Sequence, residues 1–171
     1  MKATLFMAIS INGFVARLNG DEDFLSNENW KCLLSYAKKY EHLIWGRKTY
    51  EAVKSWGGDY LESLKDISII VVSKNNKSFS EKNVTVCQSP QEAIKIIKGR
   101  KYKKAFLSGG PSLNSSFAEA GLIDEVILNC NPAIISDGIN LFSKGDFELN
   151  LKFEKVDEFS SGIIQLHYYV L

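Results

Sequence analysis

Short apolar runs alternate with amphipathic segments along most of the chain. The apolar runs are typical of β-strands and occupy residues 3–9, 42–45, 67–72, 84–87, 105–107 and 125–131. Apolar residues also recur at helical spacing, which predicts helices over residues 27–39, 48–55, a segment that starts at Pro90, and 112–120. Strands that alternate with helices favour a mostly parallel sheet with helices on both faces.

Three further features refine this predicted fold. The run at 67–72, ISIIVV, is apolar on both faces and therefore belongs to a strand covered on each side. The last segments, 149–158 and 162–170, predict a hairpin around Ser161-Gly162 that adds an antiparallel edge. Because no internal repeat or long linker interrupts the pattern, we expect residues 1–171 to form a single α/β domain of three layers.

Turn-forming and capping residues mark where the predicted elements begin and end. The loop at 18–29 precedes the first helix, where Ser26 fits the N-cap and Glu28 lies near the positive end of the helix dipole. Gly121 fits the C′ position after the helix at 112–120. The stretch at 73–83 is polar and therefore predicts a surface loop. It is too short to separate two domains.

Composition narrows the classes of partner. The formal net charge is +1, so no global field favours nucleic acid or an anionic membrane, and local groups must hold any anionic ligand. No apolar run approaches the ~20 residues that cross a bilayer. The apolar N-terminal segment also lacks a signal-peptide cleavage pattern, so we expect a cytoplasmic protein.

Cysteine, histidine and tryptophan positions point to structural roles. The three cysteines are widely spaced and form no C-x-x-C pair, so we expect buried free thiols. His42 and His167 lie on predicted strands without partners at metal-ligand spacing, and we expect no metal site. We expect the tryptophans to belong to the core; they are Trp30, Trp45 and Trp56.

Three strand-to-helix junctions carry residue types suited to a bound nucleotide. In open parallel sheets, ligands bind where the carboxyl ends of strands meet helix starts. The first junction is Gly46-Arg47-Lys48-Thr49, where glycine permits close approach, the helix start offers free amide N–H groups, and two cations follow. These residues suit a phosphate, although they would also serve as a glycine turn with two solvated cations.

The other two junctions are less specific by themselves. The second, Ser108-Gly109-Gly110-Pro111-Ser112-Leu113, forms a tight amide-rich loop that can hold a pyrophosphate. It departs from the G-x-G-x-x-G fingerprint, so a packing role for its glycines remains an alternative. The third, Ser73-Lys74, places a hydroxyl and a cation after the ISIIVV strand, where they could hold a ribose 2′-phosphate or form a solvated loop.

The order of these junctions, behind an N-terminal strand that ends in an Asn12-Gly13 turn, resembles the dihydrofolate reductase superfamily. SINGFVA at 10–16 is similar to a signature of the branch typified by the C-terminal reductase domain of riboflavin biosynthesis. Residues 109–142 resemble the segment of that branch that runs from paired glycines through Gly-Leu-Ile-Asp-Glu to a final Gly-x-x-Leu-Phe. The resemblance covers essentially the whole chain and implies a dihydrofolate-reductase-like fold.

This resemblance implies an NADPH-dependent oxidoreductase and assigns its cofactor contacts. Backbone groups of Ala8 and Ile9 would meet the nicotinamide carboxamide. The adenosine side would be lined by Gly46, Arg47, Lys48, Thr49, Ser73 and Lys74. The pyrophosphate would be held by Ser108, Gly109, Gly110, Pro111, Ser112 and Leu113. A pair of cations at the ribose favours NADPH over NADH, because a 2′-phosphate needs positive charge.

The implied substrate is a small pyrimidine-like or pteridine-like imine, bound between the first strand, the loop at 18–29 and the first helix. Candidate contacts from these elements are Asn12, Phe24 and Trp30. In dihydrofolate reductases an acidic residue on the first long helix anchors the pteridine. Glu28 and Asp23 are the candidate acids here, because hydride addition to C=N leaves a nitrogen that must gain a proton. Both carboxylates could instead be purely structural.

The sequence leaves several functional alternatives open. Asn12 stands where the riboflavin-type branch usually has aspartate, and few cations lie in the first fifty residues to hold a substrate phosphate. Reduction of 5-amino-6-(5-phosphoribosylamino)uracil ranks first and reduction of dihydrofolate second. A non-catalytic NADP-binding module is the alternative from another class. The apolar hairpin at 149–171 also predicts an open sheet edge that pairs with a second copy in a homodimer.

Overall fold

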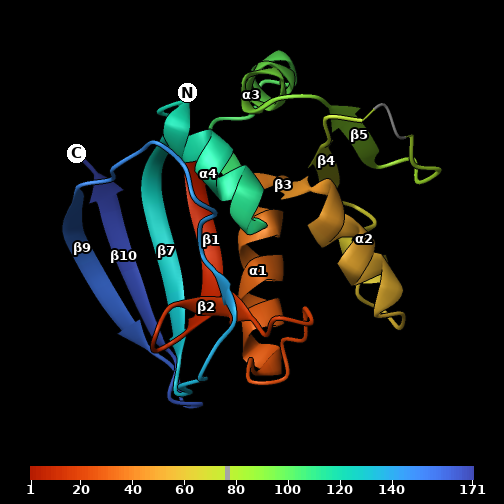
Figure 1. Cartoon of the computed structure of the whole chain (residues 1–171). Helices are drawn as coiled ribbons and strands as arrows, with labels where there is room; N and C mark the ends of the chain where they lie inside the picture. The colour runs from red at the N-terminus through yellow and green to blue at the C-terminus, as the bar shows by residue number, and fades with distance from the viewer. Residues whose placement is uncertain (76–77) are drawn as a thin grey trace.

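The computed structural model describes residues 1–75 and 78–171, and eight strands of these ranges form one sheet. The sheet has the strand order β5-β4-β3-β6-β1-β7-β10-β9 (Figure 1). Its strands are β1 (Ala3–Ser10), β3 (His42–Gly46), β4 (Ser68–Val72), β5 (Val84–Cys87), β6 (Ala105–Leu107), β7 (Ile123–Asn131), β9 (Leu151–Glu158) and β10 (Ile164–Val170). All neighbours from β5 to β7 are parallel, whereas β10 is antiparallel to β7 and β9. The predicted mostly parallel sheet with a C-terminal antiparallel hairpin is confirmed.

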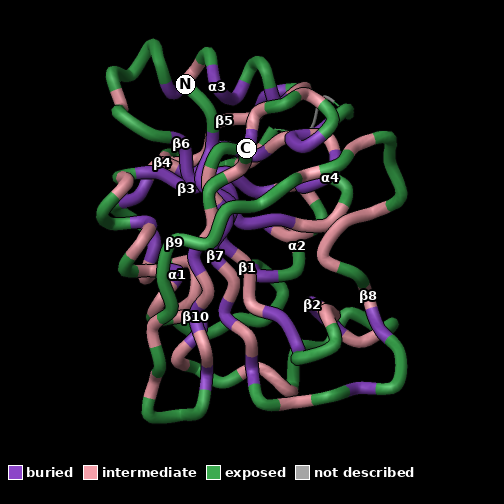
Figure 2. The backbone as a smooth tube through the Cα atoms, turned by 90° about the vertical axis from the view of Figure 1, so that its left-hand side faces the viewer, coloured by how far each residue is buried: buried purple, intermediate pink, exposed green. Residues whose placement is uncertain are grey.

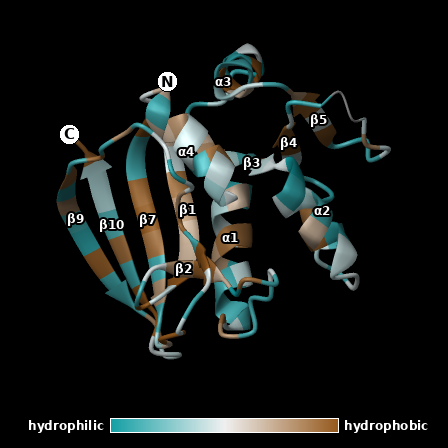
Figure 3. Ribbon diagram, viewed as in Figure 1, coloured by the Kyte–Doolittle hydropathy of each residue, from teal (hydrophilic) through white to brown (hydrophobic). Residues whose placement is uncertain are grey.

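Two helices cover each face of the sheet, which gives the predicted three layers. The helices α1 (Asn27–Tyr40) and α2 (Arg47–Ser55) pack against one face, where Leu33 and Val53 join a core with Trp45. The helices α3 (Pro90–Gly99) and α4 (Pro111–Glu119) pack against the other face in a separate core. Strands of the middle of the sheet, such as β3 and β6, are buried in Figure 2, and β1, β4 and β7 carry apolar stretches in Figure 3.

Helix ends agree closely with the capping pattern of the sequence. The helices predicted at 27–39, 48–55 and 112–120 correspond to α1, α2 and α4, with each end shifted by at most one residue. Ser26 is the N-cap of α1, but its hydroxyl makes no capping hydrogen bond and its carbonyl accepts from the Asn29 N–H (3.0 Å). Gly121 follows α4 with a φ of 61°, as expected for a C′ glycine.

Three short elements carry too little pattern to be predicted. The strands β2 (Phe14–Ala16) and β8 (Ile139–Asn140) form a separate two-stranded antiparallel sheet. A single 3₁₀ turn, η1, spans Glu62–Leu64. Strands of two or three residues show no periodicity, so only the tertiary pairing of distant segments reveals them.

Two expectations about burial were wrong. Trp56 is 42% exposed and caps the end of α2, although Trp45 is buried in the core as predicted. Cys32 and Cys130 are only half-buried, and Cys87 alone is fully buried; burial raises the pKa of the Cys87 thiol to about 11. Apolar composition predicts burial only on average, because a large part of any protein surface is apolar.

Within residues 1–75 and 78–171 no helix is both long and apolar enough to cross a bilayer. The same residues contain no group of three or more His, Cys, Asp or Glu side chains placed to share a metal ion.

Candidate functional site

A notch in the carboxyl edge of the sheet brings the first two junctions together. The strand β6 lies between β3 and β1, but it has only three residues and its last pair with β1 is Leu5 with Leu107. The chain then turns away at Ser108, whose N–H donates to the Ile44 carbonyl (3.0 Å). Beyond Leu5, β1 continues to Ser10 and pairs only with β7 among the described strands. One backbone edge of β1 therefore faces the notch.

The two glycine corners lie against each other at this notch. The Gly46 N–H donates to the Gly109 carbonyl (2.8 Å). A Cβ on Gly46 would lie 3.6 Å from the Gly110 nitrogen, and a Cβ on Gly110 would lie 2.9 Å from Thr49 Oγ1. Since α2 starts after Gly46 and α4 after Gly110, the positive ends of both helices meet at one place. First-turn N–H groups of two helices at one corner are suited to an anion.

The cations of the first junction differ in their surroundings. Arg47 is half-buried and forms an ion pair with Glu51 one helical turn later (2.6 Å). Lys48 is exposed at the start of α2. Lys48 is therefore the more accessible cation beside the two glycine corners, whereas the charge of Arg47 is partly balanced within α2.

The third junction adjoins the first, because Gly46 and Val72 pair in the β3–β4 register. Ser73 is buried, and its hydroxyl donates to the Asn75 carbonyl (2.9 Å) within its own turn. Lys74 is exposed. The predicted surface loop at 73–83 continues through residues 76 and 77, which lie outside the described residues.

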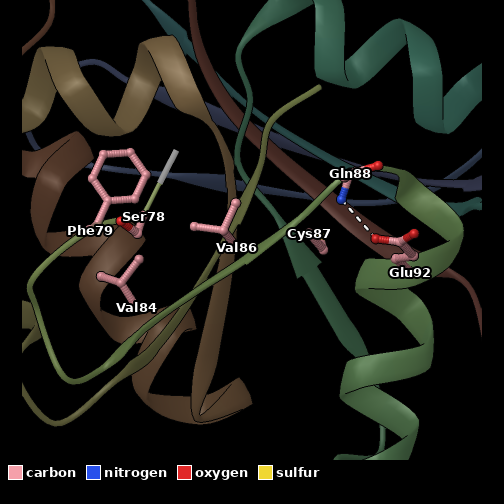
Figure 4. Close-up of a pocket in the computed structure, with 7 residues that line it drawn as sticks. All are labelled: Ser78, Phe79, Val84, Val86, Cys87, Gln88 and Glu92. Carbon is pink, nitrogen blue, oxygen red and sulfur yellow. Dashed lines mark hydrogen bonds between the residues drawn. The ribbon is translucent and has the colours of Figure 1, made fainter. Parts of the chain in front are cut away.

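A hollow of about 580 Å³ lies beside β5 (Figure 4). It is lined by Ser78, Phe79, Val84, Val86, Cys87, Gln88 and Glu92. Glu92 accepts from the Gln88 N–H (2.8 Å) while its own N–H donates to Ser89 Oγ (3.2 Å), so this carboxylate caps α3. The Ser73 N–H donates to the carbonyl of Cys87 (2.8 Å), so the third junction is bonded to a residue that lines the hollow.

The end of β1 forms the other wall of the notch. A Cβ on Gly109 would lie 2.9 Å from the Met7 sulfur, so this corner packs directly on β1. The Ile9 carbonyl accepts from Asn131 Nδ2 (3.1 Å) on the β7 side. Successive residues of a strand direct their backbone groups to opposite edges, so Ala8 and Ser10 face the notch and Ile9 faces β7. The contact of Ala8 and Ile9 backbone groups with a nicotinamide stays a prediction, and the Ile9 carbonyl is already engaged by Asn131.

The predicted substrate contacts are only partly accessible. Asn12 Nδ2 donates to the Ile135 carbonyl (2.7 Å), and Asn12 Oδ1 accepts from the Ser10 hydroxyl (2.9 Å). The side chain of Asn12 therefore fastens the 10–13 turn to a distant segment, and an aspartate would lose the Nδ2 donor. Phe24 and Trp30 are half-buried, and Trp30 meets Tyr60 edge-on with ring centroids 4.9 Å apart.

Both predicted acids make contacts within the chain. The Ser161 hydroxyl, in the turn between β9 and β10, donates to the Glu28 carboxylate. Asp23 pairs with Arg17 (2.5 Å) in the exposed loop before α1, and this hydrogen bond lowers the pKa of Asp23. Asp23 is therefore ionised at neutral pH, which is unfavourable for a proton donor.

The structure singles out two residues that sequence reasoning missed. Glu22 is reached by solvent, yet the surrounding protein removes much of its hydration and raises the pKa of Glu22 to about 7. Asn29 is the first-turn residue of α1 whose side chain points inward, on the face it shares with Leu33 and Ala37. The four-residue spacing of 29, 33 and 37 was the available signal for Asn29, but nothing in the acidic run at 21–23 distinguishes Glu22.

Three layers around a mostly parallel sheet, with two helix starts meeting beside an unpaired strand edge, define an α/β protein of the dihydrofolate-reductase-like fold. The model of the RibD C-terminal domain family matches residues 1–165, and the chain belongs to this family. The resemblance inferred from the glycine junctions is thereby confirmed.

Similar proteins and structures cover the whole chain. The chain is 26% identical to YyaP and 28% identical to YwjB of Bacillus subtilis (strain 168), two uncharacterized proteins. The alignments cover 96% and 98% of this chain and 93% and 97% of those proteins. Its fold is similar to that of a Shewanella sp. PV-4 protein ascribed to riboflavin biosynthesis, with a TM-score of 0.82, 20% identity, and 100% and 99% of the two chains covered. It is also similar to Acinetobacter baumannii RibD, with a TM-score of 0.78, 15% identity, and 99% of this chain and 58% of that one covered.

Proposed function

We propose that the protein is an NADPH-dependent reductase that transfers a hydride to a small pyrimidine-type heterocycle. The contact between Gly46 and Gly109 carries this proposal, because it joins two helix starts beside the open edge of β1. Membership of the RibD C-terminal domain family supports a reductase. A Thermotoga maritima protein of the same fold, 15% identical, is named a diaminohydroxyphosphoribosylaminopyrimidine deaminase/5-amino-6-(5-phosphoribosylamino)uracil reductase. A uracil derivative of that kind is the first candidate substrate.

The residues at the notch would divide the cofactor between them. The N–H groups at the starts of α2 and α4 would bind the pyrophosphate. Lys48, with Lys74 from the next strand end, would supply exposed positive charge for a 2′-phosphate. Ala8 and Ser10 would present backbone groups to the nicotinamide carboxamide. The bound cofactor supplies the hydride, and the chain contributes orientation.

The neutral side chain at the inward position of the first turn of α1 favours a uracil-type substrate over dihydrofolate. The inward side chain at the start of α1 is the carboxamide of Asn29, whereas the neighbouring Glu28 accepts from Ser161. A pteridine that binds as a cation needs a buried carboxylate opposite it, because an unpaired buried charge is costly. A neutral pyrimidinedione has no such need. Dihydrofolate reduction is therefore the second candidate.

A non-catalytic NADP-binding module remains the candidate from another class. The contacts of Asp23 and Glu28 favour it, since both predicted acids are engaged within the chain. Such a module would bind NADPH at the same notch without oxidising it.

Titration with NADPH and NADH, followed by quenching of tryptophan fluorescence, tests the proposal first. We expect saturable binding with a preference for NADPH. Oxidation of NADPH is then measured by absorbance at 340 nm, once with the phosphoribosylaminouracil and once with dihydrofolate as the substrate. Turnover of the uracil derivative supports the reductase, and binding of NADPH without turnover of either substrate supports the module. Absence of binding to both dinucleotides would overturn both functions.

A further inference from the structure

Four buried carboxamides connect the C-terminal hairpin to the end of β1. Asn129 and Asn131 come from β7, Gln165 from β10 and Asn29 from α1. Their exposed fractions lie between 0% and 7%, so water cannot substitute for their partners. A buried amide without a hydrogen-bond partner is destabilising, so a group of four persists only where each is paired. We call these residues the amide chain.

The shorter hydrogen bonds between the side chains of the amide chain run in one direction, and a longer contact from Asn131 Nδ2 to Asn29 Oδ1 (3.5 Å) runs the other way. Gln165 Nε2 donates to Asn129 Oδ1 (2.7 Å), and Asn129 Nδ2 donates to Asn29 Oδ1 (3.0 Å). Asn29 Nδ2 then donates to Asn131 Oδ1 (2.7 Å). Asn131 Nδ2 donates to the Ile9 carbonyl (3.1 Å). Each amide both accepts and donates, so each bond polarises the next and strengthens it.

A tyrosine donates to the first member of the amide chain. The Tyr36 hydroxyl, on α1, donates to Gln165 Oε1 (3.0 Å). His167 Nε2 lies 2.9 Å from the same oxygen. One uninterrupted series of donors thus runs from Tyr36 to the Ile9 carbonyl.

The Ile9 carbonyl lies in the part of β1 that extends beyond its pairing with β6. Beyond Leu5, β1 no longer pairs with β6 on one edge, and among residues 1–75 and 78–171 its one pairing partner there is β7. Asn131 fixes the plane of the Ile9–Ser10 peptide from the β7 side, and this sets the direction of the groups on the notch side. Asn29 Nδ2 also donates to the Ser26 carbonyl (3.1 Å), so the start of α1 is held by the same chain.

We propose that the amide chain positions the notch-facing edge of β1, at Ala8 and Ser10, against the nicotinamide and holds the start of α1 at a fixed distance from it. Its members are positioning residues, because they act through β1 and α1. The inference rests on the proposed function, since it assumes a nicotinamide at the notch. Small displacements of the reacting atoms greatly lower the rate of hydride transfer. Loss of the amide chain would displace β1 but would leave the phosphate contacts at the glycine corners intact. Loss of the chain should therefore affect kcat far more than dinucleotide affinity.

Two tyrosines of α1 provide a matched test. Tyr36→Phe removes the first donor of the amide chain, whereas Tyr40→Phe removes a hydroxyl that donates to Thr4 (2.9 Å) at the opposite end of β1. Both tyrosines are half-buried. We expect Tyr36→Phe to lower kcat roughly threefold with an unchanged Kd for NADPH, and Tyr40→Phe to leave both unchanged. Equal kcat values in the two variants would overturn the inference.

Asn131→Ala removes the last hydrogen bond of the amide chain, from Asn131 on β7 to the Ile9 carbonyl on β1. We expect kcat to fall at least roughly tenfold with little change in the Kd for NADPH, and the isotope effect from 4-deuterated NADPH to increase as hydride transfer becomes limiting. A parallel loss of affinity and kcat would indicate general damage and contradict a positioning role. Should Asn131→Ala fail to fold, Asn131→Ser is measured in its place.

Hydrogen exchange separates this inference from the proposed function. In Asn131→Ala we expect exchange of residues 6–11 to accelerate at least roughly tenfold relative to α3, whether or not a dinucleotide binds. If the wild-type protein fails to bind NADPH, the proposed function falls, and the exchange result still decides whether the amide chain holds β1. Unchanged exchange at 6–11 would refute that role.

Discussion

At the residue scale, the site depends on positions where a side chain cannot be added. Gly109 has a φ of +82° and would place a Cβ 2.9 Å from the Met7 sulfur. Gly57 has a φ of +69° but open space around a Cβ. The two glycines therefore share the backbone requirement and differ only in what surrounds them.

We predict that Gly109→Ala and Gly57→Ala both lower the free energy of unfolding by about 1–2 kcal/mol, because alanine is strained at positive φ. Only Gly109→Ala should also weaken NADPH binding, by roughly tenfold, because the added methyl group must displace the Met7 side chain beside the corner. Urea denaturation and fluorescence titration measure the two effects. Similar affinities in both variants would show that the corner is not part of the dinucleotide site.

Carboxylates near α1 differ in their ability to give up a proton at neutral pH. Partial desolvation raises the pKa of Glu22 to about 7 although solvent reaches this residue, whereas the hydrogen bond from Arg17 lowers the pKa of Asp23. A donor must be protonated, so turnover that depends on Glu22 should decrease as pH rises through about 7.

We predict that Glu22→Gln removes this decrease from the pH profile of kcat. Glu28→Gln and Asp23→Asn test the acids expected from the sequence, and a donor at either position would cost about 10²–10⁴-fold in kcat. Steady-state kinetics from pH 5 to pH 9 distinguish the three residues. If all three variants keep the wild-type profile, the proton comes from elsewhere.

At the scale of elements, the short strand β6 is joined to β3 by a side chain as well as by backbone. The two strands share one register pair, Ile44 with Leu107. His42 Nε2 accepts from the Phe106 N–H (3.2 Å), and burial lowers the pKa of His42 to about 4. The folded protein therefore keeps this imidazole neutral at pH values where the unfolded chain protonates it.

This difference in the pKa of His42 predicts that the free energy of unfolding decreases as the pH is lowered. Above pH 6.5 both states carry neutral His42 and the effect is absent; between pH 6.5 and pH 4 only the unfolded state gains the proton. By pH 4.5 the cost should reach about 2.5 kcal/mol. His42→Gln keeps an acceptor for the Phe106 N–H but cannot titrate, so denaturation curves at pH 7 and pH 4.5 should differ less for this variant. An equal loss of stability in both proteins would contradict the assignment.

At the scale of the whole molecule, the sheet ends in an exposed strand. β9 is the last strand of the sheet order and pairs only with β10 among the described strands. Leu151, Phe153 and Val156 of β9 are between 41% and 55% exposed, and the strand lies on the surface in Figure 2. An unpaired edge with exposed apolar residues is a common site of strand pairing between copies.

We propose a homodimer through this edge, as the sequence of the hairpin predicts. Sedimentation should show a dimer, and Phe153→Lys together with Val156→Lys should shift it toward monomer. Because β9 lies four strands from the notch, NADPH affinity should stay within about twofold. A wild-type protein that remains monomeric at high concentration would exclude this dimer.

The sequence by itself determined the class of fold and the chemistry of the junctions. Alternating strands and helices, capping residues and glycine pairs act over a few residues, so the ends of α1, α2 and α4 were predicted to within one residue. The same local patterns placed Gly46 and Gly109 after strands.

Only the tertiary structure decided how these parts meet. Gly46 touches Gly109 because β6 inserts between β3 and β1 and is too short to fill the gap. Asn29 bonds to Asn131, 102 residues later, while Glu28 turns toward Ser161. Such contacts depend on strand order and on the rotation of α1 about its axis. Neither is written in local periodicity, because the residues involved are far apart in the chain and meet only when the sheet is assembled.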